Sequence, residues 1–335
     1  MSMTMSREIR LKSRPTGMPT ADNFELATVS LPAPGEGQLL VKNLYMSVDP
    51  YMRGRMVDRK SYIPPFQLGE ALTGGCVGEV VQSEHPGYQV GEFVMGFLSW
   101  REYYLSNGKG LHKVNPALGP LSAYLGTAGM PGQTAYWGLL DIGKPVAGET
   151  VFVSAAAGAV GSVVCQIAKM KGCTVVGSAG SDAKVAWLKD ELGVDAAFNY
   201  KKSEKLGKTL REHAPQGVDI YFENVGGTHL EAALANMNNN GRIPVCGMIS
   251  QYNATTPSPA PRNLTNIIGM RLLLKGFIVS DYAARMGEFY ADMGKWLTSG
   301  QLKLQETVVE GIENAPSGFI GLFTGQNIGK MIVKL

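Results

Sequence analysis

The chain has 335 residues, of which 44% are hydrophobic and 18% are charged. This composition excludes a disordered chain, and a length of 335 residues predicts about two domains. The formal net charge is only +3 and no block of like charges occurs, which argues against a nucleic-acid-binding protein.

Four cysteines are present, and none of them belongs to a C-x-x-C pair. This argues against a zinc ribbon or a thioredoxin motif and predicts reduced thiols in a cytoplasmic protein. One uncharged stretch, residues 151–168, is nearly long enough for a membrane span, but it contains serine, glycine and glutamine and changes its period halfway. We therefore expect no membrane segment.

Up to about residue 125 the sequence predicts a β-rich region. Short runs at residues 38–43, 76–82 and 92–97 alternate with turns rich in glycine and proline. Closely spaced short strands with such turns are typical of a small barrel or sandwich. Residues 302–309 and 329–333 also read as strands, and we expect them to pair back with this region.

From about residue 130 predicted strands alternate with predicted helices, which indicates βαβ units and a doubly wound parallel sheet. The predicted strands are residues 149–154, 174–178, 196–199, 219–222, 243–248 and 272–279. The predicted helices are residues 159–171, a segment capped by Ser181 or Asp182, residues 229–237, and residues 283–297 with Met286, Phe289, Tyr290, Met293 and Leu297 facing the core. Residues 255–263 contain three prolines and predict a surface loop.

The stretch from Val151 to Gly161 predicts a dinucleotide site. A strand enters a turn with Ala156, Gly158 and Gly161 at the G-x-G-x-x-G positions, and an amphipathic helix follows. Gly158 would let backbone N–H groups approach a pyrophosphate, and Gly161 would let the helix pack against the strand. The alternative is an ordinary turn in an α/β protein that binds no nucleotide.

The end of the next strand favours NADP over NAD. An NAD site usually places an acid there to bind the ribose hydroxyls. Residues 177–180 contain no carboxylate, and Lys184 follows within the next turn. A cation in place of the acid suits a 2′-phosphate, although an ordinary exposed helix lysine is the alternative.

No metal site or protein nucleophile is predicted. The four histidines have no second histidine or cysteine at ligand spacing, and we expect them at the surface. Cys246 lies in an apolar strand and is predicted to be buried and inert. The chemistry is therefore expected to be that of the cofactor.

Two tyrosines are candidate substrate residues. Tyr51 lies in an irregular segment of the β-rich region, and Tyr252 follows the carboxyl end of an apolar strand. Doubly wound sheets bind ligands at that edge. For each tyrosine the alternative is a packed ring whose hydroxyl meets water.

Six motifs in order across nearly the whole chain resemble the zinc-independent medium-chain dehydrogenase/reductases. Within that superfamily they are most similar to the prostaglandin reductase and leukotriene dehydrogenase branch and to bacterial NADPH-dependent curcumin-reductase-like oxidoreductases. The motifs are residues 47–55 (SVDPYMRGR), 129–136 (GMPGQTAY), 155–161 (AAAGAVG), 223–227 (ENVGG), 246–253 (CGMISQYN) and 327–330 (NIGK). Zinc-binding relatives need a cysteine within residues 47–49 and a four-cysteine lobe, and both are absent.

The resemblance implies an α/β protein in which a GroES-like catalytic domain, residues 1–125 completed by 300–335, accompanies a Rossmann NADP-binding domain at residues 126–299. It implies Tyr252 and Tyr51 near the substrate. It implies that NADP(H) contacts Met130, Thr134, Gly158, Ala159, Val160, Gly161, Lys184, Tyr200, Asn224, Cys246, Gly247, Ile249, Ser250, Tyr252, Phe277, Ile278, Val279 and Asn327.

The expected reaction is NADPH-dependent reduction of the C=C bond of an α,β-unsaturated ketone or aldehyde. Hydride would pass from nicotinamide C4 to the β-carbon, and Tyr252 or the cofactor ribose would stabilise the enolate. Two alternatives stay open: an NADPH quinone reductase and a non-catalytic, crystallin-like NADPH-binding protein. We also expect the chain to form a homodimer. Its ligand is expected to be a small-molecule enone or enal, and we expect it to bind neither nucleic acid nor membrane.

Overall fold

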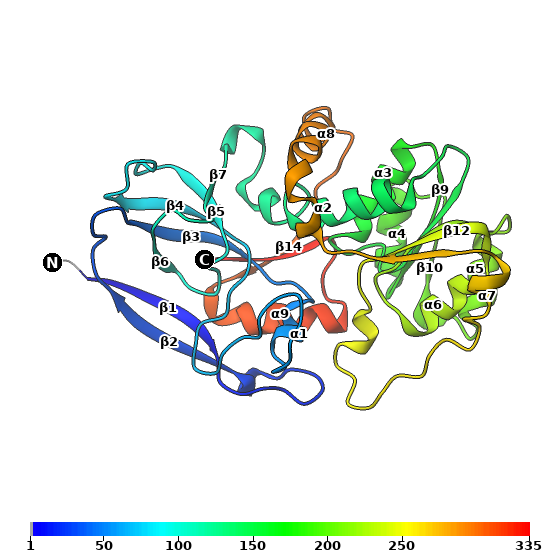
Figure 1. Cartoon of the computed structure of the whole chain (residues 1–335), viewed down its shortest axis with the longest axis horizontal. Helices are drawn as coiled ribbons and strands as arrows, with labels where there is room; N and C mark the ends of the chain where they lie inside the picture. Colours follow the sequence, from blue (N-terminus) through cyan, green and yellow to red (C-terminus); the bar gives the residue numbers. More distant parts are fainter. Residues whose placement is uncertain (1–2) are drawn as a thin grey trace. The chain divides into compact units, whose positions relative to one another are not determined.

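The computed structural model describes residues 3–335, and the chain forms two compact units (Figure 1). The first unit comprises Met1–Gly126 and Glu306–Leu335, and the second comprises Thr127–Gln305. Within the described residues, no helix combines the length and the apolarity that crossing a membrane requires.

The first unit is β-rich, as its short strands and turns predict. Its main sheet has the order β14-β15-β3-β4-β5-β7, with β6 also pairing with β3. The strands are β3 (Leu39–Ser47), β4 (Cys76–Ser83), β5 (Phe93–Gly96), β6 (Tyr103–Ser106), β7 (His112–Lys113), β14 (Glu306–Glu310) and β15 (Lys330–Lys334). A separate hairpin joins β1 (Thr4–Leu11) to β2 (Phe24–Leu31), and the helices are α1 (Met52–Arg55) and α9 (Ala315–Thr324).

The C-terminal tail returns to this sheet, which confirms the predicted pairing. β15 runs antiparallel to β3, with Ile332 opposite Ser47, and β14 lies parallel to β15. The tail also supplies Phe319 of α9, whose ring packs edge-on against Phe24 and Trp100. The first unit is thus built from both ends of the chain.

The second unit is a six-stranded parallel sheet with the order β10-β9-β8-β11-β12-β13, which confirms the predicted doubly wound fold. Its strands are β8 (Thr150–Val153), β9 (Thr174–Ala179), β10 (Ala196–Asn199), β11 (Val218–Phe222), β12 (Met237–Val245) and β13 (Leu273–Gly276). The strand order reverses between β8 and β11. Ligands bind outside the carboxyl ends of the strands at such a switch point.

Successive residues of each strand point to opposite faces of the sheet. Because apolar residues occupy both kinds of position, both faces are apolar and helices cover both. Val151 and Val153 pack in one apolar cluster, whereas Phe152 and Tyr221 pack in another. The first cluster includes side chains of α3 and α8, and the second includes side chains of α5 and α6. The helices are α2 (Met130–Trp137), α3 (Gly161–Met170), α4 (Asp182–Asp190), α5 (Leu206–His213), α6 (Gly227–Leu234), α7 (Asn266–Gly269) and α8 (Met286–Thr298).

Three local predictions were wrong. The helix predicted to end at residue 237 ends at Leu234, because the Asn236 amide donates back to the Ala232 carbonyl and the chain turns into β12. His229 is buried rather than exposed, with its ring edge-on to Tyr200 at 4.8 Å. On α8, Tyr290 is 44% exposed and Trp296 contributes to the core instead.

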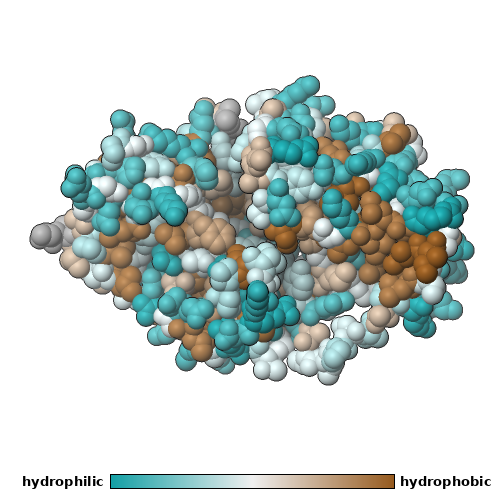
Figure 2. All heavy atoms as spheres, in the orientation of Figure 1, coloured by the Kyte–Doolittle hydropathy of each residue, from teal (hydrophilic) through white to brown (hydrophobic). Residues whose placement is uncertain are grey.

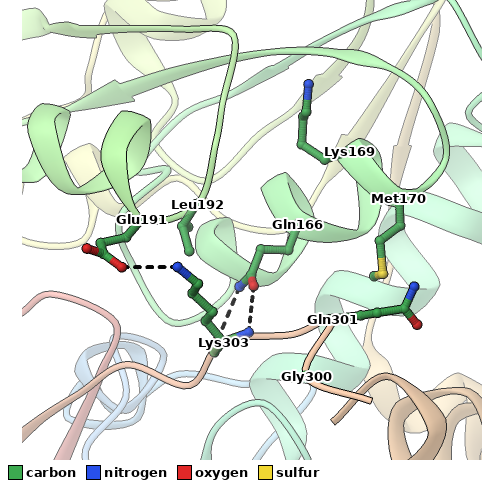
Figure 3. Close-up of a pocket in the computed structure, with 8 residues that line it drawn as sticks. All are labelled: Gln166, Lys169, Met170, Glu191, Leu192, Gly300, Gln301 and Lys303. Carbon is green, nitrogen blue, oxygen red and sulfur yellow. Dashed lines mark hydrogen bonds and ion pairs between the residues drawn. The ribbon is translucent and has the colours of Figure 1, made fainter.

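Residues 300–305, predicted to belong to the first domain, lie in the second unit. The Gln166 side chain accepts from the Lys303 N–H at 2.7 Å and donates to the Lys303 carbonyl at 3.3 Å, which ties this segment to α3. Lys303 also pairs with Glu191 at 3.0 Å. Figure 3 shows the hollow of about 190 Å³ that these residues line, at the C-terminal half of α3 and away from its glycine-rich start.

Candidate functional site

The turn from β8 to α3 leaves no room for a side chain at Gly161. A Cβ atom there would lie 2.4 Å from the Ala155 carbonyl oxygen. The Gly158 N–H closes the turn by donating to that same carbonyl at 2.9 Å. Within residues 3–335 the N–H groups of Ala159, Val160 and Gly161 have no hydrogen-bond acceptor. They form the amino end of α3 and are positioned to bind an anion.

The end of β9 presents cations and no acid. Ser181 caps α4, as predicted, by accepting from the Lys184 N–H at 3.3 Å. Lys184 is half-buried, and burial together with the nearby charge of Lys201 lowers the pKa of its ammonium group. Its ammonium group has no ion-pair partner within the part of the chain that the structure describes. Tyr200 lies at the end of β9, with its hydroxyl 3.3 Å from the point where a Gly180 Cβ would sit.

Glu223, at the end of β11, organises the strand ends and was missed by the sequence analysis. One oxygen of its fully buried carboxylate accepts from the Tyr221 hydroxyl at 2.7 Å and from the N–H groups of Val225 and Gly226 at 2.7 and 2.8 Å. Its main-chain carbonyl accepts from the N–H of Cys246 at 3.0 Å. An acid directly after an apolar strand was the available signal.

Asn224 and Cys246 take their positions from this network. The Asn224 amide donates to the Ser154 carbonyl at 2.8 Å, so the ends of β8 and β11 are cross-linked. Burial raises the pKa of the Cys246 thiol to about 12. Cys246 is therefore a neutral thiol at physiological pH. Its side chain is half-buried rather than buried as predicted, and its inertness stays a prediction.

Tyr252 folds back over the end of β12. It follows the short helix Ile249–Gln251, and its hydroxyl oxygen accepts from the Met248 N–H at 3.4 Å. A Cβ atom at Gly247 would lie 2.8 Å from that oxygen, so glycine is required beneath the phenol. The phenol thus lies at the carboxyl edge of the sheet, where the sequence analysis expected it.

The remaining predicted residues of the second unit lie near the core. The Thr134 hydroxyl donates to the Met130 carbonyl at 2.8 Å within α2. The Phe277 ring comes within 2.7 Å of a Cβ placed at Gly138, and this half-buried side chain packs against the core. Residues 277–279 continue β13 toward the short helix Val279–Arg285.

Tyr51 and Asn327 belong to the first unit. Tyr51 precedes α1, and its pKa is raised by burial and by the nearby Asp49 carboxylate. The phenol therefore stays protonated at neutral pH and can donate a hydrogen bond. The Asn327 amide donates to the Gly329 carbonyl at 2.7 Å, which fixes the approach to β15.

A buried ion pair holds the segment that leads to Tyr51. The Lys330 ammonium donates to the Val48 carbonyl at 2.8 Å and to Asp49 at 3.1 Å, and both charged side chains are less than 10% exposed. The Ser47 hydroxyl donates to the other oxygen of Asp49. The carboxylate is therefore fully engaged between β3 and β15.

Comparison with known protein families gives one match in each of the two units. Residues 7–114 match a family described as the N-terminal domain of oxidoreductase, and residues 159–298 match one described as zinc-binding dehydrogenase. The chain is 44% identical to the NADPH-dependent curcumin reductase of Escherichia coli strain K12, over 97% of this chain and 95% of that protein. It is 47% identical to prostaglandin reductase 1 of Bos taurus, over 99% of this chain and 100% of that protein.

The chain belongs to the zinc-independent medium-chain dehydrogenase/reductases. A solved structure of CurA from Vibrio vulnificus in complex with NADPH superposes with a TM-score of 0.93, at 46% identity and with 98% of each chain covered. Within residues 3–335, no three His, Cys, Asp or Glu side chains come together as metal ligands.

Replacing Lys330 by methionine leaves Asp49 charged, buried and unpaired. Breaking such a pair costs about 3–5 kcal/mol, so we expect Lys330→Met to lower the free energy of unfolding of the first unit by that amount. Urea unfolding followed by circular dichroism measures it. The control is Lys334→Met on the same strand, whose ion pair with Glu310 is exposed and is worth less than about 1 kcal/mol. Equal losses in both variants would contradict the assignment.

Proposed function

We propose that the protein reduces the C=C bond of α,β-unsaturated ketones or aldehydes with NADPH. The observation that carries the proposal is the carboxyl edge of the parallel sheet, which offers unpaired backbone amides at α3 and a lysine in place of the usual acid. The NADPH-dependent curcumin reductase, 44% identical over nearly the full chain, supports the reaction class. Curcumin is itself a conjugated enone.

The residues at this edge fit a dinucleotide. The amides of Ala159, Val160 and Gly161 would bind the pyrophosphate at the positive end of α3. Lys184 would bind the 2′-phosphate, and Tyr200 would flank the adenosine. Asn224, Cys246–Gly247, Ile249–Ser250 and residues 277–279 would line the rest of the cofactor, with Met130, Thr134 and Asn327 near its nicotinamide end.

When bound, the nicotinamide supplies a hydride for the β-carbon of the substrate. The protein then has to stabilise the negative charge that develops on the carbonyl oxygen until a proton, which water can supply, reaches the α-carbon and completes the reduction. Tyr252 would donate its phenolic proton in a hydrogen bond to that enolate oxygen, because it lies at the strand end where the nicotinamide is expected. Tyr51, held protonated by burial, would provide a second donor or a wall of the substrate site.

The state of Cys246 suits an electrophilic substrate. The β-carbon of an enone reacts with thiolates, and a thiol whose pKa is about 12 has almost no thiolate at neutral pH. Cys246 can therefore line the cofactor site without being alkylated by the substrate.

The function is tested by NADPH oxidation with an enone panel, a quinone panel and no acceptor. We expect turnover with conjugated enones or alkenals and little with quinones. Faster turnover with quinones would indicate a quinone reductase. Tight NADPH binding without turnover on any acceptor would indicate a non-catalytic NADPH-binding protein.

Lys184→Ala should distinguish the two nicotinamide cofactors. Loss of a charge-assisted contact is worth roughly 1.5–3 kcal/mol, so NADPH should bind about 10- to 100-fold more weakly while NADH is barely affected. Quenching of protein fluorescence measures both dissociation constants. Lys189→Ala, which removes the same charge near the other end of α4, serves as the control. Equal weakening of both cofactors would show that Lys184 acts through folding.

Tyr252→Phe should lower kcat and kcat/KM together if the phenol stabilises the transition state. The expected loss in kcat is about 10- to 100-fold, the smaller value applying if water replaces the hydroxyl. NADPH affinity should hold because the ring remains. Tyr290→Phe, at an exposed position on α8, is the matched control. An unchanged kcat in Tyr252→Phe would remove this residue from the catalytic assignment.

We also propose a homodimer that pairs through β13. This strand is one of the two edge strands of the parallel sheet, the other being β10, and unpaired edges are templates for a second strand. Apolar side chains are exposed there: Ile268 by 80%, Leu273 by 49% and Met270 by 37%. Figure 2 shows this apolar area on the surface around α7 and β13.

Light scattering after gel filtration tests the dimer. The chain of 35.9 kDa should elute at twice its mass, and Leu273→Lys should shift it to the monomer because a buried charge would oppose pairing. Leu26→Lys, at an equally exposed leucine of the first unit, should leave the mass unchanged. A monomeric wild-type chain would refute the proposal. The cytoplasmic location stays a prediction.

A further inference from the structure

Two side chains converge on Gly180, at the end of β9. A Cβ atom at this position would lie 3.3 Å from the Tyr200 hydroxyl and 3.4 Å from the Lys201 Cε atom. Both residues belong to the short helix Tyr200–Lys202, which follows β10. The Asn199 side chain fixes its start by accepting from the Lys201 N–H at 3.1 Å. The absence of a side chain at Gly180 therefore lets the phenol and the lysine stem lie close to the end of β9.

Lys201 also interacts electrostatically with a second lysine, Lys184. Burial and then the charge of Lys201 lower the pKa of Lys184, so the two ammonium groups lie within electrostatic reach of one another. In the region that the structure describes, Lys201 and Lys184 have no ion-pair partner. The neighbouring Lys202 differs, because it pairs with Asp182 at 2.5 Å. That pairing also neutralises the only acid in the first turn of α4.

Two like charges within electrostatic reach repel one another in the ligand-free protein. A dianion between them would turn this repulsion into two attractions, and the amino end of α4 adds positive partial charge on the same side. The arrangement therefore suits a phosphate group with two negative charges better than it suits a ribose hydroxyl.

We propose that Lys201 is a second cation for the 2′-phosphate of NADPH and shares with Lys184 the discrimination against NADH. This inference rests on the proposed function, since it assumes that the adenosine end of the cofactor lies at Gly180. The inference also predicts an effect on the stability of the ligand-free protein. Removing Lys201 relieves repulsion in the ligand-free protein, so the same change that weakens the cofactor should not destabilise the fold.

The test compares Lys201→Ala with Lys189→Ala, which removes an equal charge near the far end of α4. Dissociation constants for NADPH, NADH, adenosine 2′-monophosphate and adenosine 5′-monophosphate are measured by calorimetry. Lys201→Ala should weaken NADPH and the 2′-monophosphate about 5- to 20-fold and leave the other two ligands within about twofold. Lys201→Arg should restore most of the affinity. Lys189→Ala should leave all four ligands within about twofold.

Thermal unfolding supplies a second readout that needs no activity. Ligand-free Lys201→Ala should melt at the same temperature as the wild type or higher, while the upward shift caused by NADPH should shrink. Unchanged NADPH affinity, or equal weakening of NADPH and NADH, overturns the inference. If Lys184→Ala is selective and Lys201→Ala is silent, only this inference fails. If neither variant is selective, the proposed position of the 2′-phosphate fails as well.

Discussion

The buried carboxylate of Glu223 is the constraint on which the cofactor edge depends. One of its oxygens receives three short hydrogen bonds, and its backbone carbonyl holds the start of the Cys246–Gly247 segment. A buried carboxylate without partners would be costly, so the loop after β11 has to keep its amides pointed at Glu223. The position of Asn224 is fixed by the same loop. Its backbone N–H and its side-chain amide donate to Ser154, which joins β11 to β8. The ends of three adjacent strands are therefore held in one arrangement before any ligand arrives.

Charge is distributed around this edge for an anionic ligand. The amino ends of α3 and α4 point to the side where the strands end, and neither turn offers a carboxylate that lacks a cation. Asp182 is paired with Lys202, which leaves Lys184 and Lys201 as the net charge. In the proposed phosphate site, repulsion between them would lower the stability of the ligand-free protein slightly and would increase the free energy gained when a phosphate binds.

In the first unit, a buried ion pair holds the segment that contains the candidate residue Tyr51. The segment with Tyr51 has no metal-ligand cluster to hold it, and the Asp49–Lys330 ion pair takes this structural task. Arg55 adds a second clamp, because its guanidinium donates to the carbonyls of Pro64 and Thr73 while stacking on Phe66 at 3.9 Å. Tyr51 is thus presented on a short helix whose flanks are tied to the surrounding loops. A rigid presentation suits the substrate contact proposed for Tyr51.

The sequence alone determined the class of fold and indicated an NADP(H) cofactor, because these depend on local patterns. Apolar strands alternate with amphipathic helices, Gly161 stands where helix and strand touch, and the end of β9 lacks an acid. Tertiary structure decided what depends on strand order and on contacts distant in sequence. It brought Lys330 to Asp49, 281 residues away, placed the Lys201 side chain at Gly180 and within electrostatic reach of Lys184, and buried His229 against Tyr200. No periodicity reports such pairings, since each joins residues from different elements whose neighbours are set only when the sheet is assembled.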